Sequence, residues 1–446
     1  MQRSSQSALS DAQPSERRRS VLVLAENFPS RIQPWLLSSL EYLLQRGVEV
    51  TIAANRALGS TYPEKVERLG LLQSVRYLPA SSVSDVLRGC RPYLVPFTRG
   101  GQQAYRGLFR LLASERGKPR GATAWAKAIV RAPLLGGGRF DLVHAHNLSA
   151  AYEYRGVAEA LGIPLVATFH GLTPKGGVNR LPEERAQELF QRGSRFFVNS
   201  RFAQGQLEWL GCPGEKIRVL PEGLPLQEYP FRARPFPSPV RLILMTVARL
   251  SPDKGLRYAI GAIAGLRKMG LDVEYRLVGT GPQKAELSDL VQELGVGEQV
   301  KFLGEVTDAE LGRQYQEAHI FILPSVPDPS GNSHVETQGV VIQEAQASGV
   351  LVVAARTGGI PECVDDGRSA FLVPPQDAEA LAQKLAWLID HGDSWLAWQR
   401  EARAWVESHF AMELVGERLW AHYSELWEPP PGRQTNRQAI ASGVAP

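Results

Sequence analysis

The chain contains few cysteines. Three occur among its 446 residues, Cys90, Cys212 and Cys363, and none has the short spacing of a paired site. A disulfide framework or a cysteine-rich zinc site needs more thiols at closer spacing, so both are excluded. We expect three small, buried side chains in a reducing cytoplasm.

Long apolar runs are also missing. The apolar stretches have the length of strands, as at residues 242–245, whereas a membrane-spanning helix needs roughly 20 apolar residues. The first residues are polar and lack the apolar core of a signal peptide. These absences predict a cytoplasmic protein.

The chain has little net charge, +4 from 50 basic and 46 acidic side chains, and we expect no nucleic-acid partner. The charge is unevenly distributed, since residues 81–140 hold eleven basic and two acidic side chains. Apolar residues such as Phe109 and Trp125 are interleaved there. Two interpretations stay open: an amphipathic surface that contacts the inner face of the cytoplasmic membrane, or a solvated basic face.

What the chain does contain is a repeated alternation of short apolar runs with helix-sized amphipathic segments, over 43% apolar residues. This alternation predicts an α/β fold with two doubly wound parallel sheets. The expected strands of the first sheet are 21–24, 48–53, 75–78, 142–145, 165–169, 196–199 and 217–220. Those of the second are 241–247, 273–278, 300–303, 320–323, 351–354 and 371–373.

Composition suggests the boundaries. Polar tails, expected to be disordered, occupy 1–19 and 429–446, and a proline-rich stretch cannot continue a helix or a central strand. The predicted units are an N-terminal domain at 20–225, a linker at 226–239, a second domain at 240–410, and a helix at 411–428 that packs back on the first domain. A cleft between the carboxyl ends of the two sheets is the expected ligand site.

Two cations follow the first strand of the second domain. Arg249 and Lys254 lie in the turn Ala-Arg-Leu-Ser-Pro-Asp-Lys-Gly. A guanidinium and an ammonium at this spacing can bind a diphosphate and stabilise charge on a leaving phosphate. The next strand ends in Gly279-Thr-Gly281, where glycine lets the backbone approach a ligand. This pair does not complete the glycine fingerprint of a dinucleotide site, so hydride transfer is not indicated.

Two glutamates, Glu336 and Glu344, enclose seven residues that include Gly339. A helix is expected to begin near Gln338, so its free N–H groups and dipole would point at an anion that Gly339 allows to come close. Glu344 can accept hydrogen bonds from a ribose diol, and Glu336 can reach the sugar.

Histidines end two strands of the first domain. His170 follows strand 165–169 at the expected cleft, where a functional and a structural role are both open. His144 and His146 have a spacing that suits a metal, but no third ligand is placed by the sequence.

In this order and at strand ends, these motifs resemble those of glycosyltransferase family 4. The resemblance implies a GT-B fold, in which two Rossmann-like domains face each other across a cleft. It implies a nucleotide-sugar substrate, with a UDP- or GDP-sugar expected, and retention of anomeric configuration without a metal. The absence of an Asp-x-Asp sequence is consistent with that. The first domain is similar to the colanic acid and amylovoran branch.

By position, the resemblance assigns the donor diphosphate to Arg249 and Lys254, the sugar hydroxyls to Glu336 and the ribose to Glu344. Gly279, Gly281, Gly339 and Val340 complete the expected donor site, and His170 would assist by position. The implied reaction moves a hexose to a polysaccharide precursor or a glycolipid, including a lipid-linked saccharide.

Three positions depart from the family pattern. Gln33 stands where an acid is frequent, Thr337 where glycine is usual, and Glu222 where asparagine is common. These departures bear on the donor and acceptor more than on the class of reaction. A sugar phosphorylase, a nucleotide-sugar epimerase or a non-catalytic subunit of a polysaccharide assembly complex stay open as alternatives.

Overall fold

The structure is a computed structural model. It describes residues 18–29, 34–55, 57, 64–77, 102, 106, 109, 139–173, 177–236, 241–327 and 335–427. Gln33, Cys90, nearly all of the predicted tails and most of the basic segment 81–140 lie outside the described residues. In the described part of the chain, no helix is long and apolar enough to cross a membrane.

The first half of the chain forms a seven-stranded sheet with the order β3-β2-β1-β4-β5-β6-β7, in which every pair of neighbours is parallel. Its strands are β1 (Ser20–Leu24), β2 (Glu49–Ala54), β3 (Val75–Tyr77), β4 (Leu142–Ala145), β5 (Leu165–Phe169), β6 (Arg195–Val198) and β7 (Ile217–Val219). The central strands are apolar at nearly every position because helices cover both faces of the sheet.

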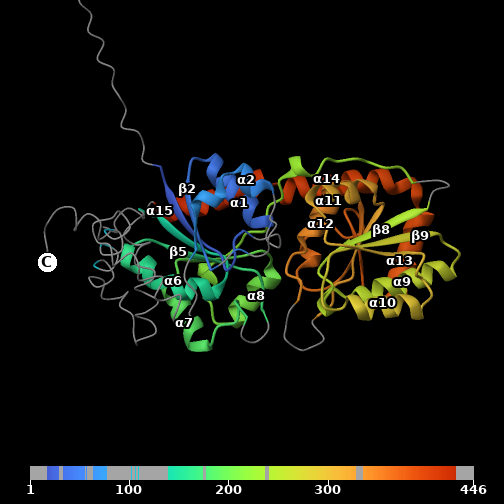
Figure 1. The fold of residues 1–446 in the computed structure, drawn as a ribbon, viewed down its shortest axis with the longest axis horizontal. Coiled ribbons are helices and arrows are strands. Elements are labelled where there is room, and N and C mark those ends of the chain that lie inside the picture. Colours follow the sequence, from blue (N-terminus) through green and yellow to red (C-terminus); the bar gives the residue numbers. More distant parts are fainter. Residues whose placement is uncertain are drawn as a thin grey trace, which may run out of the picture.

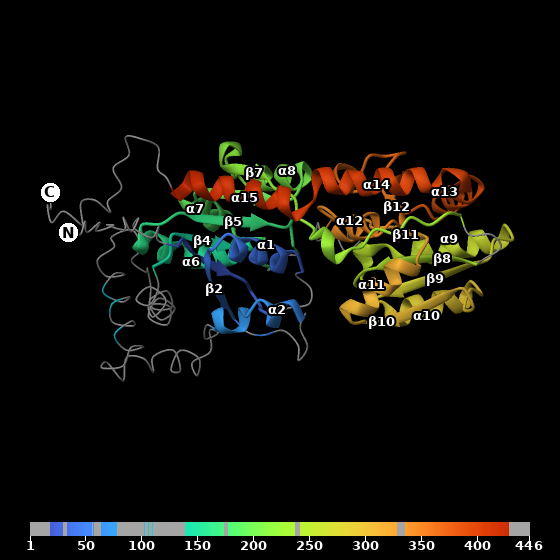
Figure 2. The ribbon, with the colours of Figure 1, turned by 90° about the horizontal axis from the view of Figure 1, so that it is seen from above.

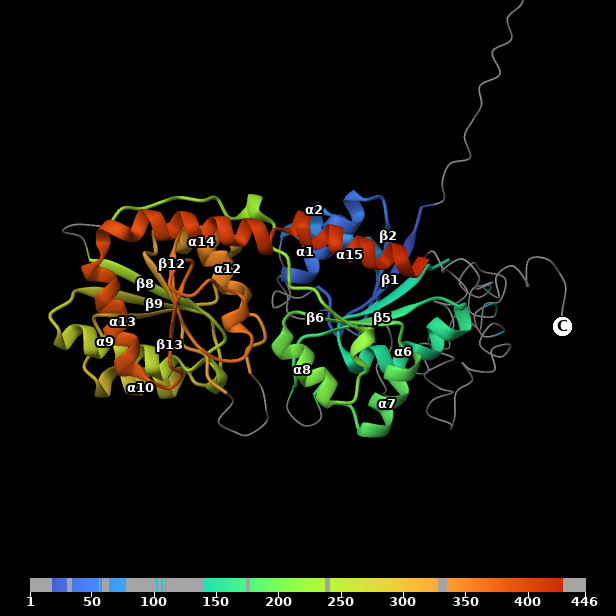
Figure 3. The same cartoon turned by 180° about the vertical axis from the view of Figure 1, so that it is seen from behind.

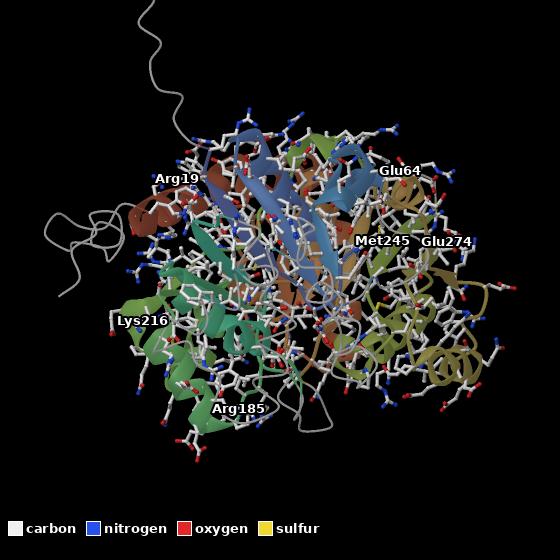
Figure 4. All side chains as sticks on the ribbon, turned by 60° about the vertical axis from the view of Figure 1, so that its left-hand side comes forward. Arg19, Glu64, Arg185, Lys216, Met245 and Glu274 are labelled. Atoms are coloured by element: carbon white, nitrogen blue, oxygen red, sulfur yellow. The ribbon has the colours of Figure 1, made fainter. Side chains whose placement is uncertain are left out.

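Helices on one face of this sheet are α6 (Leu148–Leu161), α7 (Glu183–Arg192) and α8 (Arg201–Trp209), which share one apolar cluster with the strands. The other face is covered by α1 (Pro34–Gln45), the short α2 (Glu64–Arg68) and the last helix, α15 (Met412–Trp427). Arg19, just before β1, lies over the ring of Trp427 at the end of α15, at 5.4 Å (Figure 4). The last helix therefore belongs to the first sheet.

The second sheet has six parallel strands in the order β10-β9-β8-β11-β12-β13. They are β8 (Leu242–Val247), β9 (Val273–Val278), β10 (Val300–Gly304), β11 (Ile320–Leu323), β12 (Leu351–Ala355) and β13 (Phe371–Val373). One face carries α9 (Leu256–Lys268), α10 (Lys284–Glu293) and α13 (Ala378–Asp390), and the other carries α11 (Asp308–Glu317), α12 (Val340–Ala347) and α14 (Trp395–His409).

Short 3-10 helices complete the described elements, at Leu71–Ser74, Gly214–Lys216, Leu226–Glu228, Pro252–Lys254, Ile360–Glu362 and Gly392–Ser394. The two sheets form two lobes along the long axis of the molecule (Figure 1). All thirteen predicted strands are present, each within two residues of its predicted ends, so the α/β prediction is confirmed. The helix expected near Gln338 begins at Val340.

The chain passes between the lobes at two adjacent places. Leu224 and Ala411 form a β-bridge, with the Leu224 N–H donating to the Phe410 carbonyl at 2.7 Å. Helix α14 ends just before Ala411 and α15 begins just after it, and the two helices run end to end along one side of both lobes (Figures 2 and 3).

Residues 226–236, in the range predicted as a linker, lie against the second lobe. Arg234 donates to the carbonyls of Tyr315, Ala318 and Ser348, and its backbone N–H donates to Gln399 at 2.7 Å. Arg234 therefore anchors its part of this stretch to α11, α12 and α14, whereas Glu228 pairs with Lys65 of α2 at 2.9 Å.

Candidate functional site

Both sheets place their switch of strand order at the centre, between β1 and β4 in the first and between β8 and β11 in the second. Adjacent loops leave in opposite directions at such a point, which opens a crevice at the carboxyl ends of the strands. The turn after β8, the segment before α12 and the loop after β5 all begin at these ends.

The turn after β8 brings Lys254 to Glu336. The Lys254 Nζ lies 2.5 Å from Glu336 Oε2 and 3.6 Å from Asp253 Oδ2, and the side chains of Lys254 and Glu336 are each 18% exposed. Burial lowers the pKa of Lys254, but the attraction of Glu336 and Asp253 outweighs it, so the pKa is raised. Lys254 is therefore a charged ammonium at neutral pH.

Arg249 lies at the outer end of the same turn. Its guanidinium is 3.8 Å from Asp253 Oδ1, its Nε donates to Ser251 Oγ at 3.3 Å, and its side chain is 67% exposed. Asp253 thus stands between the two cations, and most of the guanidinium surface stays open to a ligand.

The glycines after β9 lie directly on this turn. A Cβ at Gly279 would come within 2.0 Å of the Ala248 carbonyl oxygen, and one at Gly281 within 2.4 Å of the Leu250 carbonyl oxygen. The Leu250 N–H donates to the Thr280 carbonyl at 2.9 Å. Glycine is required here so that the two turns can pack backbone on backbone and hold Arg249 in place.

The start of α12 has the features of an anion-binding helix N-terminus. Gly339 occupies the N-cap in the left-handed region at φ 76° and supplies no side-chain cap, and Val340 is the first helical residue. The first-turn N–H groups of a helix attract anions through their partial positive charge.

A second glycine pair supports the backbone before α12. The Gly359 N–H donates to the Glu336 carbonyl at 2.9 Å, and a Cβ at Gly358 would come within 2.0 Å of the same oxygen. The turn at residues 356–362 therefore fixes the position of Glu336.

Glu344 is not in contact with the Lys254–Glu336 pair. It is 6% exposed, and its Oε2 accepts a hydrogen bond from the Tyr315 hydroxyl at 2.7 Å. Burial raises the pKa of Glu344, although the hydroxyls of Tyr315 and Tyr229 act in the opposite direction. The ribose role of Glu344 stays a prediction.

His170 follows β5 and reaches the second lobe. Its Nδ1 is 3.0 Å from Glu222 Oε1, and its ring packs on Trp35 with 4.2 Å between centroids. The Thr337 hydroxyl donates to the His170 carbonyl at 3.3 Å. The residue that follows Glu336 is therefore in direct contact with His170.

Three contacts join the lobes beside this point. The Asn199 amide donates to Thr337 Oγ1 at 3.0 Å, and the Glu222 N–H donates to Gln338 Oε1 at 2.8 Å. The Glu362 carboxylate accepts the N–H groups of the first two residues of α8, each at 2.7 Å. Sequence reasoning noted Thr337 and Glu222 only as departures and predicted no contact between the lobes for Gln338 or Glu362.

Of the other two histidines, His144 has a structural role. His144 is buried between the Tyr423 hydroxyl and Thr168 Oγ1, at 2.6 and 2.7 Å. Burial lowers its pKa to about 3, and that of His146 is also lowered by burial. Over the described ranges, no group of three or more candidate ligands could hold a metal ion. Cys212 and Cys363 are buried free thiols, as predicted.

Comparisons with known proteins agree with this arrangement. The family model for glycosyl transferases group 1 matches residues 232–405, and the model for glycosyltransferase family 4 matches residues 36–228. A putative colanic acid biosynthesis glycosyltransferase of Salmonella typhimurium, WcaL, is 34% identical over 414 residues, which cover 88% of this chain and 96% of that protein. Its counterpart in Escherichia coli is 34% identical over 57% of this chain and 63% of that protein.

The amylovoran biosynthesis glycosyltransferase AmsK of Erwinia amylovora is 32% identical over 57% of this chain and 62% of that protein. Among solved structures, Anabaena HepE in complex with UDP-glucose superposes with a TM-score of 0.66 at 19% identity, over 91% of this chain and all of that one. Sucrose-phosphate synthase of Thermosynechococcus elongatus superposes with a TM-score of 0.64 at 18% identity, over 95% of this chain.

The fold is GT-B, as predicted, with two Rossmann-like lobes that meet at the carboxyl ends of their strands. The length of the match to the Salmonella typhimurium protein, together with the two family models, decides the assignment. The chain belongs to glycosyltransferase family 4 and is an enzyme of that family.

Proposed function

We propose that this enzyme moves a hexose from a UDP- or GDP-sugar to a polysaccharide-precursor or glycolipid acceptor, with retention of anomeric configuration. The observation that carries the proposal is the Lys254–Glu336 contact, which joins a charged ammonium to a carboxylate at the uncapped start of α12. A cation next to a sugar-binding carboxylate is what a sugar diphosphate requires.

The diphosphate would lie between the turn after β8 and α12. Lys254 carries three donors, and the two carboxylates beside it leave capacity for a phosphate oxygen. Arg249 would supply a second charge from the solvent side, since most of its side chain is exposed. Val340, at the first turn of α12, would add backbone N–H donation.

The sugar and the ribose would be bound by the two glutamates. Glu336 can accept from sugar hydroxyls once the diphosphate shares its ammonium partner. Glu344 keeps acceptor capacity beside the Tyr315 hydroxyl because each carboxylate oxygen has two lone pairs.

In the proposed reaction, the bond from the anomeric carbon to the leaving phosphate breaks while the acceptor oxygen bonds to that carbon on the same face. The proton of the acceptor goes to the departing phosphate oxygen. Arg249 and Lys254 stabilise the charge that develops there, and His170 helps to place the sugar.

The names of the relatives support an exopolysaccharide role, because WcaL is described in colanic acid and AmsK in amylovoran biosynthesis. The complex of HepE with UDP-glucose supports a nucleotide-sugar donor.

A thermal-shift panel of UDP, GDP, ADP, UDP-glucose, UDP-galactose and GDP-mannose tests the donor. A ligand that binds only the folded protein raises the melting temperature in proportion to the logarithm of its concentration over Kd. We expect one base to give a clear shift for both its diphosphate and its sugar conjugate. If no nucleotide shifts the transition, the proposal is wrong.

Lys254→Ala is expected to weaken the nucleoside diphosphate found in that panel by about 10- to 100-fold, because a charge-assisted hydrogen bond contributes about 1.5–3 kcal/mol. Isothermal titration measures the change. Lys268→Ala is the matched control, since this exposed lysine is the last residue of α9, a helix about 20 Å long that begins two residues after Lys254. Equal affinity in the Lys254 and Lys268 variants would refute the diphosphate role.

Glu336→Gln is expected to retain most of the diphosphate affinity and to lose turnover of the nucleotide sugar by about tenfold or more, because it binds the sugar. Release of the nucleoside diphosphate gives the readout. Glu293→Gln, at an exposed position of α10, is the control. Unchanged turnover in the Glu336 variant would show that this glutamate does not contact the sugar.

A further inference from the structure

Two of the three departures from the family pattern meet at one histidine. Glu222 lies in the loop after β7 and Thr337 lies before α12, yet both contact His170. They approach it from different sides, Glu222 at the imidazole and Thr337 at the backbone carbonyl. Two positions that are far apart in the sequence therefore contact a single residue.

The second lobe holds both contacts in place. Gln338 binds the backbone of Glu222 twice, since its Oε1 accepts the Glu222 N–H at 2.8 Å and its Nε2 donates to the Glu222 carbonyl at 3.2 Å. Gln338 is 1% exposed, so water does not compete for these bonds. A Cβ at Gly171 would come within 2.4 Å of Thr337 Cγ2, so Thr337 fits only because a glycine follows His170.

The His170 ring leaves one nitrogen unused. Trp35 covers the ring, and His146 stacks at 6.2 Å between centroids. Glu222 faces Nδ1, while Nε2 is buried and has no hydrogen-bond partner among the residues that the structure describes. A buried polar atom without a partner is costly unless a ligand satisfies it.

We propose that Glu222 is a positioning residue that fixes the tautomer of His170, and that Thr337 and Gln338 complete this arrangement from the second lobe. The Glu222 carboxylate accepts a hydrogen bond from the Nδ1–H group, so Nε2 keeps its lone pair and accepts a hydrogen bond from a substrate hydroxyl. This role rests on the proposed function, because the hydroxyl belongs to the donor sugar or the acceptor.

The Nδ1 and Oε1 atoms are 3.0 Å apart, a distance that suits a hydrogen bond, but the two groups do not yet meet hydrogen-bond geometry. Catalytic hydrogen bonds are frequently misaligned before substrate binds and improve in the complex. Because Gln338 follows Glu336 by two residues, its hydrogen bonds tie Glu222 to the segment that carries Glu336.

Nitrogen NMR of the histidine side chains tests the tautomer in the free protein and with the nucleoside diphosphate bound. The chain has eight histidines, and the loss of one signal in His170→Asn assigns the resonance. We expect the Nδ1–H form of His170 in the unmodified protein and in Glu222→Asp. In Glu222→Leu we expect a shift to the Nε2–H form, which free histidine prefers.

Gln338→Leu keeps the carboxylate but frees the Glu222 backbone, and a partial shift in the same direction is expected. This variant also decides the question if Glu222→Leu does not fold. Thr337→Val and Thr337→Ser form a matched pair, since only serine keeps the hydroxyl that binds the His170 carbonyl. An Nδ1–H tautomer that persists in Glu222→Leu, or in Gln338→Leu if the former is unfolded, overturns the proposal.

Turnover gives a second readout. In Glu222→Leu, kcat with the nucleotide sugar from the thermal-shift panel is expected to fall by about 10- to 100-fold with KM within about threefold, and Glu222→Asp is expected to restore it. If the unmodified protein binds no nucleotide sugar but the tautomer of His170 still shifts in Glu222→Leu, only the proposed function is contradicted. A normal kcat in Glu222→Leu with a shifted tautomer contradicts the positioning role alone.

Discussion

At the scale of single residues, His144 links the core of the first lobe to solution pH. Burial lowers its pKa to about 3 from the ordinary 6.5. Below pH 6.5 the unfolded chain takes up a proton that the folded chain refuses, so stability falls as the pH drops from about 6.5 towards about 3. As the pH falls from 7 to 5, this one side chain is expected to lower the free energy of unfolding by about 2 kcal/mol.

His144→Gln is expected to flatten the dependence of the unfolding free energy on pH between 6 and 4 by about 1.4 kcal/mol per pH unit. Urea denaturation across this range measures the slope. His391→Gln, at an exposed position, is the control and is expected to keep the original slope. An unchanged slope in His144→Gln would mean that the buried imidazole does not govern acid unfolding.

The sequence could predict which candidate residues at strand ends would lie close together. Lys254 and Glu336 follow β8 and β11, which are neighbours in the sheet, so strand order alone brings them together. Gln338 and Glu362 could not be predicted in this way. Their partners lie 116 and 161 positions away in the other lobe, and that contact depends on how the two sheets face each other.

At the scale of elements, two glycines inside helices distinguish the effect of side-chain packing on stability from the effect of helix propensity. Gly416 lies in α15, where an added Cβ would come within 2.5 Å of the Tyr42 ring of α1. Gly312 lies in α11, where an added Cβ would meet nothing within 4 Å. The two positions share helical structure and differ in their surroundings.

Gly416→Ala is therefore expected to destabilise the protein by about 1–3 kcal/mol through overpacking. Gly312→Ala is expected to stabilise it by about 0.5–1 kcal/mol, because alanine favours the helix. Chemical denaturation of the two variants measures the sign of each change in unfolding free energy. Stabilisation by both substitutions would show that α1 and α15 do not pack as closely as described.

The strands themselves were accessible to sequence reasoning because both sheets are covered on two faces. Runs such as β5 and β12 are buried at every position, which leaves a continuous apolar signal. The tertiary contacts of residues 226–236 could not be predicted in the same way. Prolines there exclude a continuing helix or a central strand, but the hydrogen bonds of Arg234 to the carbonyls of Tyr315 and Ser348 depend on tertiary packing.

At the scale of the whole molecule, Glu362 connects the lobes through the start of α8. Its carboxylate accepts the N–H groups of Arg201 and Phe202 and adds a negative charge at the positive end of that helix. Glu362→Ala is expected to lower the local opening free energy at the start of α8 by about 1 kcal/mol. This change corresponds to roughly fivefold faster amide exchange at these two positions. Hydrogen exchange followed by mass spectrometry measures it.

Glu183→Ala is the control for this experiment. Glu183 occupies the first turn of α7 and contacts Gln187 of the same helix, so amide exchange at α8 is expected to stay unchanged. Equal exchange at Arg201 and Phe202 in both variants would mean that Glu362 does not hold the lobes together in solution.

The bridge between Leu224 and Ala411 has an evolutionary consequence. Because the chain leaves the first lobe and returns to it at one point, the second lobe is a cassette inserted between β7 and α15. Segments whose ends lie together can be exchanged without displacing either terminus. Recombination among relatives could therefore pair an existing first lobe with a new second lobe, provided that the residues in the positions of Thr337, Gln338 and Glu362 still fit the first lobe.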